Sequence, residues 1–382
     1  MKNAIWLLCL GLGMAPRLTS AAPLPWPAEA WALSENLTSL DDNFTRNLSG
    51  ASWNSETKTL WVCVNGPGKF VALMENEAGS FKIDTQDDVR AEWATSGDFE
   101  GITQVDLKED SVYIIVEGVD LIKKFDVTQY GVVKLVRSWN IRTHMPTSGS
   151  AGSEGIAFVP DKWLTAKGFL DAKGDPYVSK NGMGGLMFVA HQNGGRVYVF
   201  DLNPASSAYD FVGKYRTNHR ESSGLAFDRS TGKLYVWHNV DSNTLEEVSL
   251  ASTDVGSERQ FTSLRTWTAP RTGNLEGIAM TPAAAYQHQI CITDDDNQDG
   301  AGLMCFKHFA PDRASVDRQV AASSDDAEQG RKAVVVLTGS SLELVDKGVY
   351  QKIGLRFVNI PVPPKAHIVS AHIQFTTADE TP

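Results

Sequence analysis

The sequence predicts an all-β fold in which a β-propeller is followed by the beginning of a β-sandwich module. Three observations lead to this prediction. A short motif recurs five times, short apolar runs with strand chemistry follow each copy, and the chain changes character near residue 314. Units of about 50 residues that each supply several strands are typical of propeller blades.

The recurring motif centres on a glycine that follows a polar residue and precedes apolar ones. The glycine lies at positions 50, 101, 155, 224 and 277, which gives intervals of 51, 54, 69 and 53 residues. The long interval contains an insertion, residues 163–185. Five copies predict five blades, and a sixth blade without a marked repeat remains an alternative. A long β-sandwich or two unrelated β domains would not explain the recurring glycine.

Each glycine is followed by two further runs in which β-branched and aromatic residues predict strands. The second strands of the units are expected at residues 60–64, 112–116, 187–190, 234–237 and 290–293, and the third strands at 69–73, 121–125, 196–200, 244–248 and 302–306. Residues 26–45 precede the first repeat and are expected to supply the outer strand of the last blade. The predicted propeller therefore spans residues 26–310, and no helix of useful length is expected in it.

The N-terminal residues 1–21 resemble a secretory signal peptide. Lys2 precedes a short apolar run at 4–14, and small residues lie around position 20. No later run reaches the roughly 18 apolar residues that a membrane-spanning helix needs. We therefore expect an exported protein, extracellular or periplasmic, that has no membrane span and is a monomer.

The formal net charge of −11 argues against nucleic-acid binding, because phosphate neutralisation needs clustered Lys and Arg. Negative charge is better suited to bound cations. After the signal segment three cysteines remain, so at most one disulfide can form within the chain. Cys291 and Cys305 flank a turn and are its candidates; the alternative is that they are buried small apolar residues.

From residue 314 to 382 a polar stretch is followed by further strand-like runs. They lie at residues 333–337, 341–345, 353–357 and 367–375. Their period-two alternation predicts half-buried strands. This segment is similar to the first half of the β-sandwich modules appended to secreted bacterial multidomain proteins, which are usually taken as carbohydrate or surface binders.

In a propeller blade, the loop entering the innermost strand and the loop leaving the second strand lie on the same face of the ring. The residues just before the recurring glycine are Ser49, Glu100, Glu154, Ser223 and Glu276. Burial of a carboxylate is costly unless it is paired or metal-bound. Carboxylates from several blades aimed at one axis predict a Ca²⁺ site; the alternative is that each accepts backbone N–H bonds from a neighbouring blade.

A second group of polar residues lies where the chain leaves the second strand of each unit, on the same face. Its members are Asn65, Glu117, Gln192, Asn239 and Asp295, and the residues before them include His191, His238 and Asp294. Turn preference explains the asparagines. It does not explain Glu117, His191 or His238, for which a role in a site and a structural role are both open.

Basic residues recur in the loops that enter the innermost strands. They are Arg46, Arg142, His144, His219, Arg220 and Arg271. Arg binds phosphate and carboxylate through two parallel hydrogen bonds, so this rim is a candidate for a small anionic ligand, a phosphoester or a surface glycan. The alternative is an ordinary solvated rim.

The most specific local motif is the acidic stretch 294–300. From Asp295 it reads D-x-N-x-D-G, as in the first half of a calcium-binding loop, with Asp295, Asn297 and Asp299 as oxygen ligands. The closing Glu of an EF-hand and its flanking helices are absent, because position twelve of the loop is Phe306. The alternative is a charged hairpin turn.

Three copies of the motif, Asp98-Phe-Glu-Gly-Ile, Ser153-Glu-Gly-Ile-Ala and Leu275-Glu-Gly-Ile-Ala, resemble the SdiA-regulated propeller family and the phytase-like and esterase-like propellers. The resemblance covers roughly residues 45–309. It implies axial Ca²⁺ ligands at Glu100, Glu154 and Glu276, with Glu117 and Asp294 as supporting carboxylates. Ser49 and Ser223 replace Glu in two repeats, and five blades are evident where those phytases have six.

Two functions follow from these observations. The first is a secreted calcium-binding propeller that acts as a recognition or scaffold module. The second is a calcium-dependent phosphoester hydrolase, in which the metal polarises a phosphoryl oxygen and Arg220 and Arg271 hold phosphate. No G-x-S-x-G, H-E-x-x-H, C-x-x-C or P-loop motif points to another chemistry. Two neighbouring cations beside an Arg would favour hydrolysis.

Overall fold

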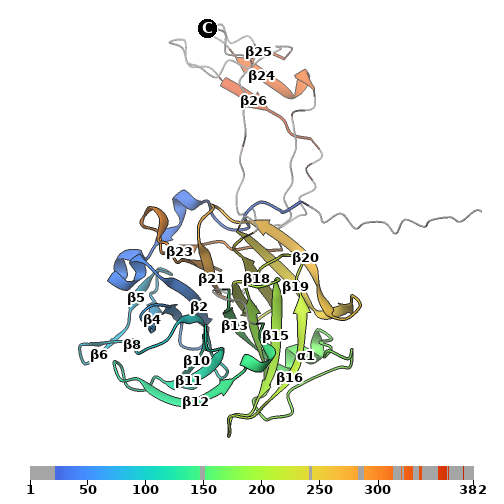
Figure 1. Cartoon of the computed structure of the whole chain (residues 1–382). Helices are drawn as coiled ribbons and strands as arrows, with labels where there is room; N and C mark the ends of the chain where they lie inside the picture. The colour runs from blue at the N-terminus through green and yellow to red at the C-terminus, as the bar shows by residue number, and fades with distance from the viewer. Residues whose placement is uncertain are drawn as a thin grey trace, which may run out of the picture. The chain divides into compact units, whose positions relative to one another are not determined.

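The computed structural model describes residues 22–146, 151–240, 243–282 and 288–312, and beyond them residues 320, 322–329, 335–337, 352–358, 360 and 373. The chain forms two compact units, Met1–Ala310 and Pro311–Pro382 (Figure 1). The predicted signal peptide lies outside the described residues.

The first unit is a five-bladed β-propeller, as the repeats predicted. Each blade is an antiparallel sheet whose strands follow one another outward from the axis. Blade one consists of β2 (Leu48–Asn54), β3 (Thr59–Val64), β4 (Lys69–Glu75) and β5 (Phe81–Ile83), with β8 (Glu92–Ala94) also paired to β4. Blade two consists of β9 (Phe99–Thr103), β10 (Ser111–Val116), β11 (Leu121–Asp126) and β12 (Lys134–Asn140). A small hairpin, β6 (Thr85–Gln86) and β7 (Val89–Arg90), precedes β8.

Blades three to five complete the ring. Blade three consists of β13 (Ser153–Pro160), β14 (Gly185–His191), β15 (Arg196–Leu202) and β16 (Tyr209–Arg216). Blade four consists of β17 (Gly224–Asp228), β18 (Lys233–His238), β19 (Thr244–Asp254) and β20 (Arg259–Thr268). Blade five consists of β21 (Leu275–Met280), β22 (Ile290–Asp294), β23 (Leu303–Phe306) and β1 (Glu35–Asn36). The outer strands β16 and β20 also pair in parallel, which joins blades three and four.

The recurring glycine marks the place where the innermost strands pack backbone against backbone. A Cβ atom at any of the five positions would lie within 3.0 Å of backbone in the neighbouring blade. At Gly101, for example, it would meet the carbonyl oxygen of Glu154, and at Gly155 that of Ser223. Real Cβ atoms do not approach so closely, so only glycine fits. The five-fold repeat is therefore a packing requirement of a ring this narrow.

The core is divided among the junctions between blades. Five separate apolar clusters are found in the described residues, and each draws its side chains from two adjacent blades. The junction of blades one and two is rich in aromatic rings, with Phe70 stacked on Trp93 and packed against Phe125. Burial of both faces of each sheet explains why the second strands read as continuous apolar runs.

The last blade is completed by the N-terminal segment, as predicted. Strand β1 pairs antiparallel with β23, with Glu35 opposite Cys305. Leu24 adds a backbone bridge to Trp267 of β20, and Trp26 packs edge-on against Trp237 and Phe306. The 3₁₀ turns η1 (Trp31–Leu33), η2 (Thr38–Leu40) and η3 (Asp42–Thr45) lead from this segment into blade one; η4 (Arg142–His144) and η5 (Gln298–Gly300) lie further along the chain.

Cys291 and Cys305 form a disulfide across β22 and β23, where they lie directly opposite each other with Cα atoms 4.0 Å apart. This confirms the predicted pairing. Cys63 is a buried free thiol.

The insertion between β13 and β14 contains α1 (Asp161–Ala166), the one α-helix among the described residues. At six residues it is too short to leave a helical period in the sequence, so it was not expected. The segment after α1 packs on the edge of blade three, where the Asp201 carboxylate accepts hydrogen bonds from the Tyr177 hydroxyl (3.1 Å) and the Lys180 N–H (2.6 Å). Trp163 also donates to the carbonyl oxygen of Arg229 at 3.1 Å, so the insertion contacts blade four as well.

The second unit contains a three-stranded antiparallel sheet with β24 at its centre. The strands are β24 (Asp326–Gln329), β25 (Val335–Val336) and β26 (Lys352–Leu355), preceded by the 3₁₀ turn η6 (Ser323–Asp325). Arg356 donates through Nε to the Asp325 carboxylate at 2.7 Å. The strands expected at 341–345 and 367–375 lie outside the described residues, apart from residue 373.

Candidate functional site

Three glutamates from three blades converge at one end of the propeller axis. Glu100, Glu154 and Glu276 each offer a carboxylate oxygen, and these atoms lie within 4.8 Å of one another. All three residues are buried. The structure therefore brings together the side chains that the repeat predicted to meet. We call this set the axial glutamates.

β-Bulges place these side chains. In blades one, three and five the register between the innermost and second strands shifts at the motif. The polar residue and the glycine after it together lie opposite a single residue of the second strand. The polar residues concerned are Ser49, Glu154 and Glu276. In blade two the shift leaves out Glu100. A bulge bends the strand and re-aims a side chain. The polar residue is thereby released from the alternation of the strand.

Ser49 occupies the corresponding position in blade one and links two of the axial glutamates. Its Oγ lies 2.5 Å from Oε2 of Glu100 and 3.0 Å from Oε2 of Glu276. A hydroxyl carries one proton, so it cannot donate to both carboxylates at once. The three oxygens therefore need a further proton or a cation between them.

A second acidic group overlaps the first and shares Glu100. Carboxylate oxygens of Asp98, Glu100 and Glu117 also lie within 4.8 Å of one another, with Asp98 exposed. A Cβ on Gly152 would collide with the Glu117 side chain, so a larger residue here would push the carboxylate out of its present position. Asp98 was not proposed as a site residue, although it lies in the repeat two positions before Glu100.

The electrostatics of this second group favour a bound positive charge. Burial raises the pKa of Glu100 to about 8; the hydrogen bond from Ser49 lowers it, and the charges of Asp98 and Glu117 raise it further. Burial, followed by the charge of Asp98, raises the pKa of Glu117 to about 7.

The other two axial glutamates are affected more strongly. Burial, and then the charges of Glu100 and Glu276, raise the pKa of Glu154 well above its usual range. Burial and the charge of Glu100 do the same to the pKa of Glu276. Carboxyls in this condition take up protons unless a cation neutralises them. The donor set contains only oxygen atoms, so the cation it fits is a hard one.

A belt of amides surrounds the acidic groups on the same face. Asp295 accepts hydrogen bonds from Asn65 (3.3 Å) and Asn274 (3.2 Å), and Asn239 donates to Asn274 at 2.5 Å. Burial raises the pKa of Asp295. The asparagines that turn preference explained thus also support a carboxylate that faces the axis.

Asp294 and Arg271 were expected to act separately, as a metal ligand and as an anion ligand. The structure pairs them instead: Arg271 donates to the buried Asp294 carboxylate and, at 2.9 Å, to the carbonyl oxygen of Gln298. The guanidinium also lies 4.4 Å from the centre of the Trp31 ring. Each side chain is thus the ion-pair partner of the other, and Arg271 also contacts the N-terminal segment through Trp31.

The acidic turn 294–300 does not gather its side chains as a calcium loop would. Asp295 is held by amides of the belt, whereas Asp299 is largely exposed, with its carboxylate 4.0 Å from Arg271. Asn297 has the left-handed backbone of a tight turn, with φ of 48°. The geometry matches the charged hairpin turn, because Asp295 and Asp299 point to different partners.

The histidines separate into two environments. His191 is buried, accepts a hydrogen bond from the Asn193 N–H at 3.0 Å, and has its pKa lowered to about 4 by burial. Its imidazole is therefore neutral near pH 7. His219 stacks on buried His238, with ring centres 3.9 Å apart. Arg220, the residue after His219, is exposed.

His238 has a partner at each ring nitrogen. Nδ1 lies 2.5 Å from the carbonyl oxygen of Glu221, and Nε2 lies 3.1 Å from the carboxylate of buried Glu246. Burial raises the pKa of Glu246, but the hydrogen bond and charge of His238 outweigh it and leave the pKa lowered. Glu246 was missed because it lies in a third strand, outside the positions compared between repeats.

No protein-family model and no curated protein matches this chain. Its fold is similar to that of solved structures at low identity. These include the nidogen/laminin complex (12% identity, 65% of this chain and 76% of that chain covered, TM-score 0.35). They also include the β-propeller domain of Swd1 from Myceliophteria thermophila (10% identity, 68% of this chain and 82% of that chain, TM-score 0.37). The strand order and the ring of inner strands establish the propeller independently.

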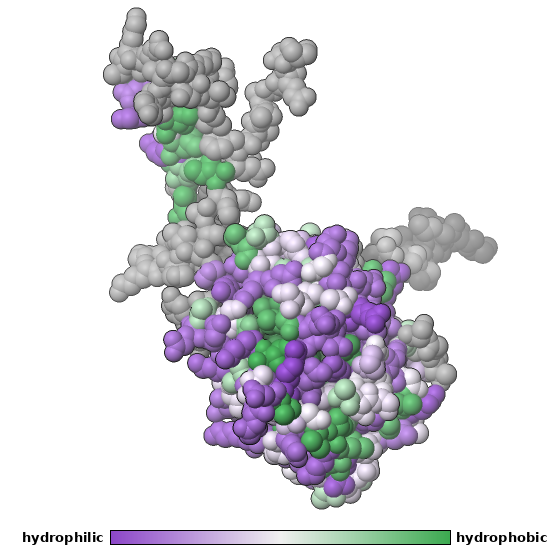
Figure 2. Space-filling view, turned by 90° about the vertical axis from the view of Figure 1, so that its left-hand side faces the viewer, coloured by the Kyte–Doolittle hydropathy of each residue, from purple (hydrophilic) through white to green (hydrophobic). Residues whose placement is uncertain are grey.

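Helices long and apolar enough to cross a membrane are not found in the described part of the chain. On the face drawn in Figure 2, hydrophobic residues form small patches separated by hydrophilic ones.

Proposed function

We propose that this chain is an exported calcium-binding propeller whose axial face recognises an anionic ligand. The observation that carries the proposal is the set of three buried axial glutamates with mutually close oxygens and one hydroxyl between two of them. Burying three carboxylates together is costly without a compensating cation. Three oxygen donors from three blades, with Ser49 as a fourth oxygen, supply part of the six to eight that Ca²⁺ takes.

Glu100, Glu154 and Glu276 would hold the cation, and Asp98 and Glu117 would support it from the exposed side. A cation bound there supplies positive charge to which a phosphate, a carboxylate or the hydroxyls of a glycan can add oxygen ligands. The acidic surroundings exclude anions that do not contact the cation, because like charges repel. The chain's own residues thus provide selectivity as well as coordination.

The proposed export of the protein and its proposed family are supported by the sequence alone. Residues 1–21 have the pattern of a signal peptide, and millimolar Ca²⁺ is the regime that extracellular calcium modules use. The Glu-Gly-Ile motif supports membership in the SdiA-regulated and phytase-like propellers. We infer that the protein acts as a monomer.

A second candidate function, calcium-dependent phosphoester hydrolysis, is favoured by one observation. The two acidic groups share Glu100, so two cation positions would be bridged by a single carboxylate. Paired metals can stabilise both the attacking and the leaving oxygen of a phosphoryl group. Arg271, which would have held the phosphate, is engaged with Asp294, so recognition remains the first proposal.

Calorimetric titration of the chelator-treated protein with CaCl₂ tests the first proposal. We expect binding by the wild type and a loss of at least tenfold in affinity in a Glu100→Gln/Glu276→Gln double variant. Glu109→Gln, at an exposed glutamate paired with Lys124, is the matched control and should bind normally. Absence of Ca²⁺ binding by the wild type would refute the proposal.

Phosphate release from phytate and from p-nitrophenyl phosphate, with Ca²⁺ and with chelator, tests the second. Calcium-dependent turnover that the double variant lacks would establish a hydrolase. Calcium binding without turnover would leave the recognition function.

A further inference from the structure

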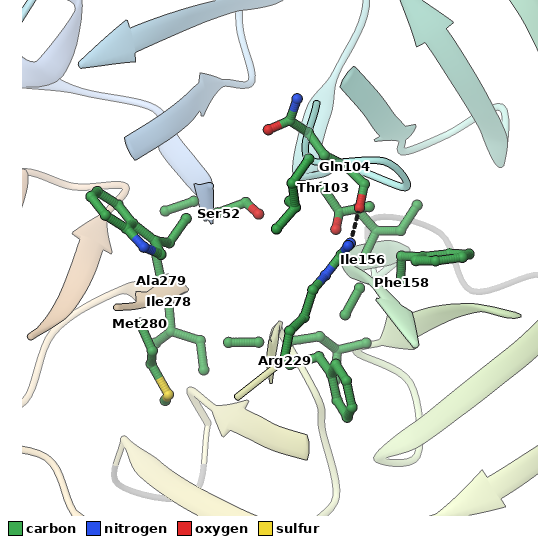
Figure 3. Close-up of a pocket in the computed structure, with 16 residues that line it drawn as sticks. Ser52, Thr103, Gln104, Ile156, Phe158, Arg229, Ile278, Ala279 and Met280 are labelled. Carbon is green, nitrogen blue, oxygen red and sulfur yellow. Dashed lines mark hydrogen bonds between the residues drawn. The ribbon is translucent and has the colours of Figure 1, made fainter. Parts of the chain in front are cut away.

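The opposite end of the propeller axis carries a partly buried cation, Arg229, that the proposed function does not use. The axial glutamates precede the recurring glycines, whereas the residues after those glycines line the other end of the channel. Arg229 directly follows β17 in blade four, and its side chain projects into that end of the channel. Figure 3 shows its side chain extending across the channel toward Gln104.

Arg229 is held in place by main-chain oxygens and an aromatic ring. It donates to the carbonyl oxygen of Val105 at 2.9 Å and to that of Gln104, both in blade two. Its guanidinium carbon lies 5.4 Å from the centre of the Phe158 ring in blade three. A single side chain from blade four thereby contacts both preceding blades and has a fixed orientation.

The charge of Arg229 lacks a close counter-ion. Among the described residues, its contacts are carbonyl oxygens and the Phe158 ring, and no carboxylate lies within ion-pair distance. Burial lowers the pKa of Arg229 to about 10, partly offset by the charge of Asp106. A guanidinium has five N–H donors, and two hydrogen bonds leave others to offer.

A cavity of about 550 Å³ opens beside this guanidinium. Phe158, Met183 and Leu107 provide an apolar wall, and Lys108 and Lys162 add two exposed cations to its rim. Its volume falls in the range of roughly 300–1,000 Å³ typical of small-molecule sites, which combine apolar walls with a few placed polar groups.

The charge around the cavity contrasts with that of the whole chain. Three cations and two carboxylates, Glu56 and Asp106, line it, whereas the chain carries a net charge of −11. The Asp106 carboxylate already accepts a hydrogen bond from the Lys108 N–H at 2.9 Å. A net positive pocket in an acidic protein attracts anions locally.

We propose that this cavity binds a small organic acid with an apolar body, whose carboxylate pairs with Arg229 while its body packs on Phe158 and Met183. Arg and carboxylate form paired hydrogen bonds that a neutral isostere cannot reproduce. The site lies on the face opposite the axial glutamates and is independent of any cation there.

Calorimetric titration of the whole chain with 2-naphthoate, and with neutral 2-naphthamide of the same shape, tests this site. We expect at least tenfold tighter binding of 2-naphthoate. Arg229→Gln should remove that preference and leave the affinity for 2-naphthamide unchanged. Lys82→Gln, an exposed cation on β5 in blade one, is the control and should bind both probes as the wild type does.

Equal affinity for the two probes, or no binding of 2-naphthoate at 5 mM, would overturn the proposal. Arg229 is mostly buried, so its variant could fail to fold. In that case a Lys108→Gln/Lys162→Gln variant at the exposed rim provides the test. We expect 2-naphthoate to bind this variant about threefold more weakly than the wild type. Unchanged binding in that folded variant would also overturn the proposal.

Discussion

The hydroxyl of Ser49 in blade one lies 3.0 Å from a carboxylate oxygen of Glu276 in blade five, across the junction where the ring closes. The same hydroxyl lies 2.5 Å from Glu100 in blade two. One serine thus connects three consecutive blades at the axis. Its position in the repeat is occupied by glutamate in three other blades. In blade one a hydroxyl therefore takes the place of a carboxylate.

Replacement of this serine tests the value of that contact. We expect Ser49→Ala to lower the free energy of unfolding by about 1–3 kcal/mol in chelator, because the hydroxyl that donates to a buried carboxylate is lost. Ser223→Ala is the matched control. Its hydroxyl occupies the equivalent position in blade four and bonds the Trp237 carbonyl oxygen at 3.3 Å. Urea denaturation of both variants measures the difference, and equal losses would contradict the role assigned to Ser49.

The raised carboxyl pKa values predict an unusual dependence of stability on pH. The pKa values of Glu100 (about 8) and Glu117 (about 7) lie above that of an unfolded glutamate, so the folded chain binds more protons between roughly pH 4 and 8. The resulting stability is complete below the unfolded value and is lost as pH rises through the folded values. In chelator, Tm should therefore fall from pH 5 to pH 8.

Added Ca²⁺ should suppress that fall, because the cation stabilises the ionised carboxylates that protons otherwise neutralise. Scanning calorimetry at several pH values, with and without CaCl₂, provides the measurement. A Tm that rises from pH 5 to pH 8 in chelator would show that the axial carboxyls are already neutralised by another group.

Neutralising one axial glutamate should change stability in opposite directions with and without the cation. We expect Glu154→Gln to raise Tm in chelator at pH 8, since it removes a buried carboxyl that must either take up a proton or carry a charge beside like-charged neighbours. The same variant should lose most of the Tm increase that Ca²⁺ gives the wild type. Thermal melts with a CaCl₂ series measure both effects, and a lower Tm in chelator would argue for a purely structural carboxylate.

Breaking the pair of Arg271 and Asp294 should be costly without affecting the axial site. We expect Arg271→Ala to destabilise by about 3–5 kcal/mol, because it leaves a buried carboxylate unpaired. Lys134→Ala breaks an exposed pair with Asp126 and should cost less than about 1 kcal/mol. Urea denaturation compares the two. Loss of Ca²⁺ binding in folded Arg271→Ala would restore a role for this arginine at the site.

The sequence was most informative where packing demands one residue type. The five glycines mark close backbone contacts at the axis, so their spacing predicted the number of blades and the starts of the innermost strands. The apolar runs predicted the second and third strands, and residues 26–45 were correctly expected to close the last blade. The position before each glycine then predicted which glutamates converge.

Contacts that depend on bulges and long side chains could not be predicted from the sequence. The bulge at Glu100 changes which side chains face the axis, and a residue pattern does not reveal an extra unpaired residue. Arg271 lies in the loop that enters the innermost strand of blade five, and Asp294 ends the second strand of that blade. The residue pattern alone did not show that their side chains bind each other. Arg229 was not among the positions compared between repeats, because it follows the innermost strand of blade four at the opposite end of the axis.

The closure of blade five by β1 has a consequence for the timing of folding. Glu35 meets Cys305 only after about 270 further residues exist. At a synthesis rate of roughly 5–20 residues per second, that interval is about 15–55 s. During this time the ring is an open arc, and Phe306, which contacts both Trp26 and Trp31 in the folded chain, has not yet been made. Closure of the ring thus waits for the synthesis of β23, so chaperones that shield the N-terminal tryptophans should increase the yield of the folded protein.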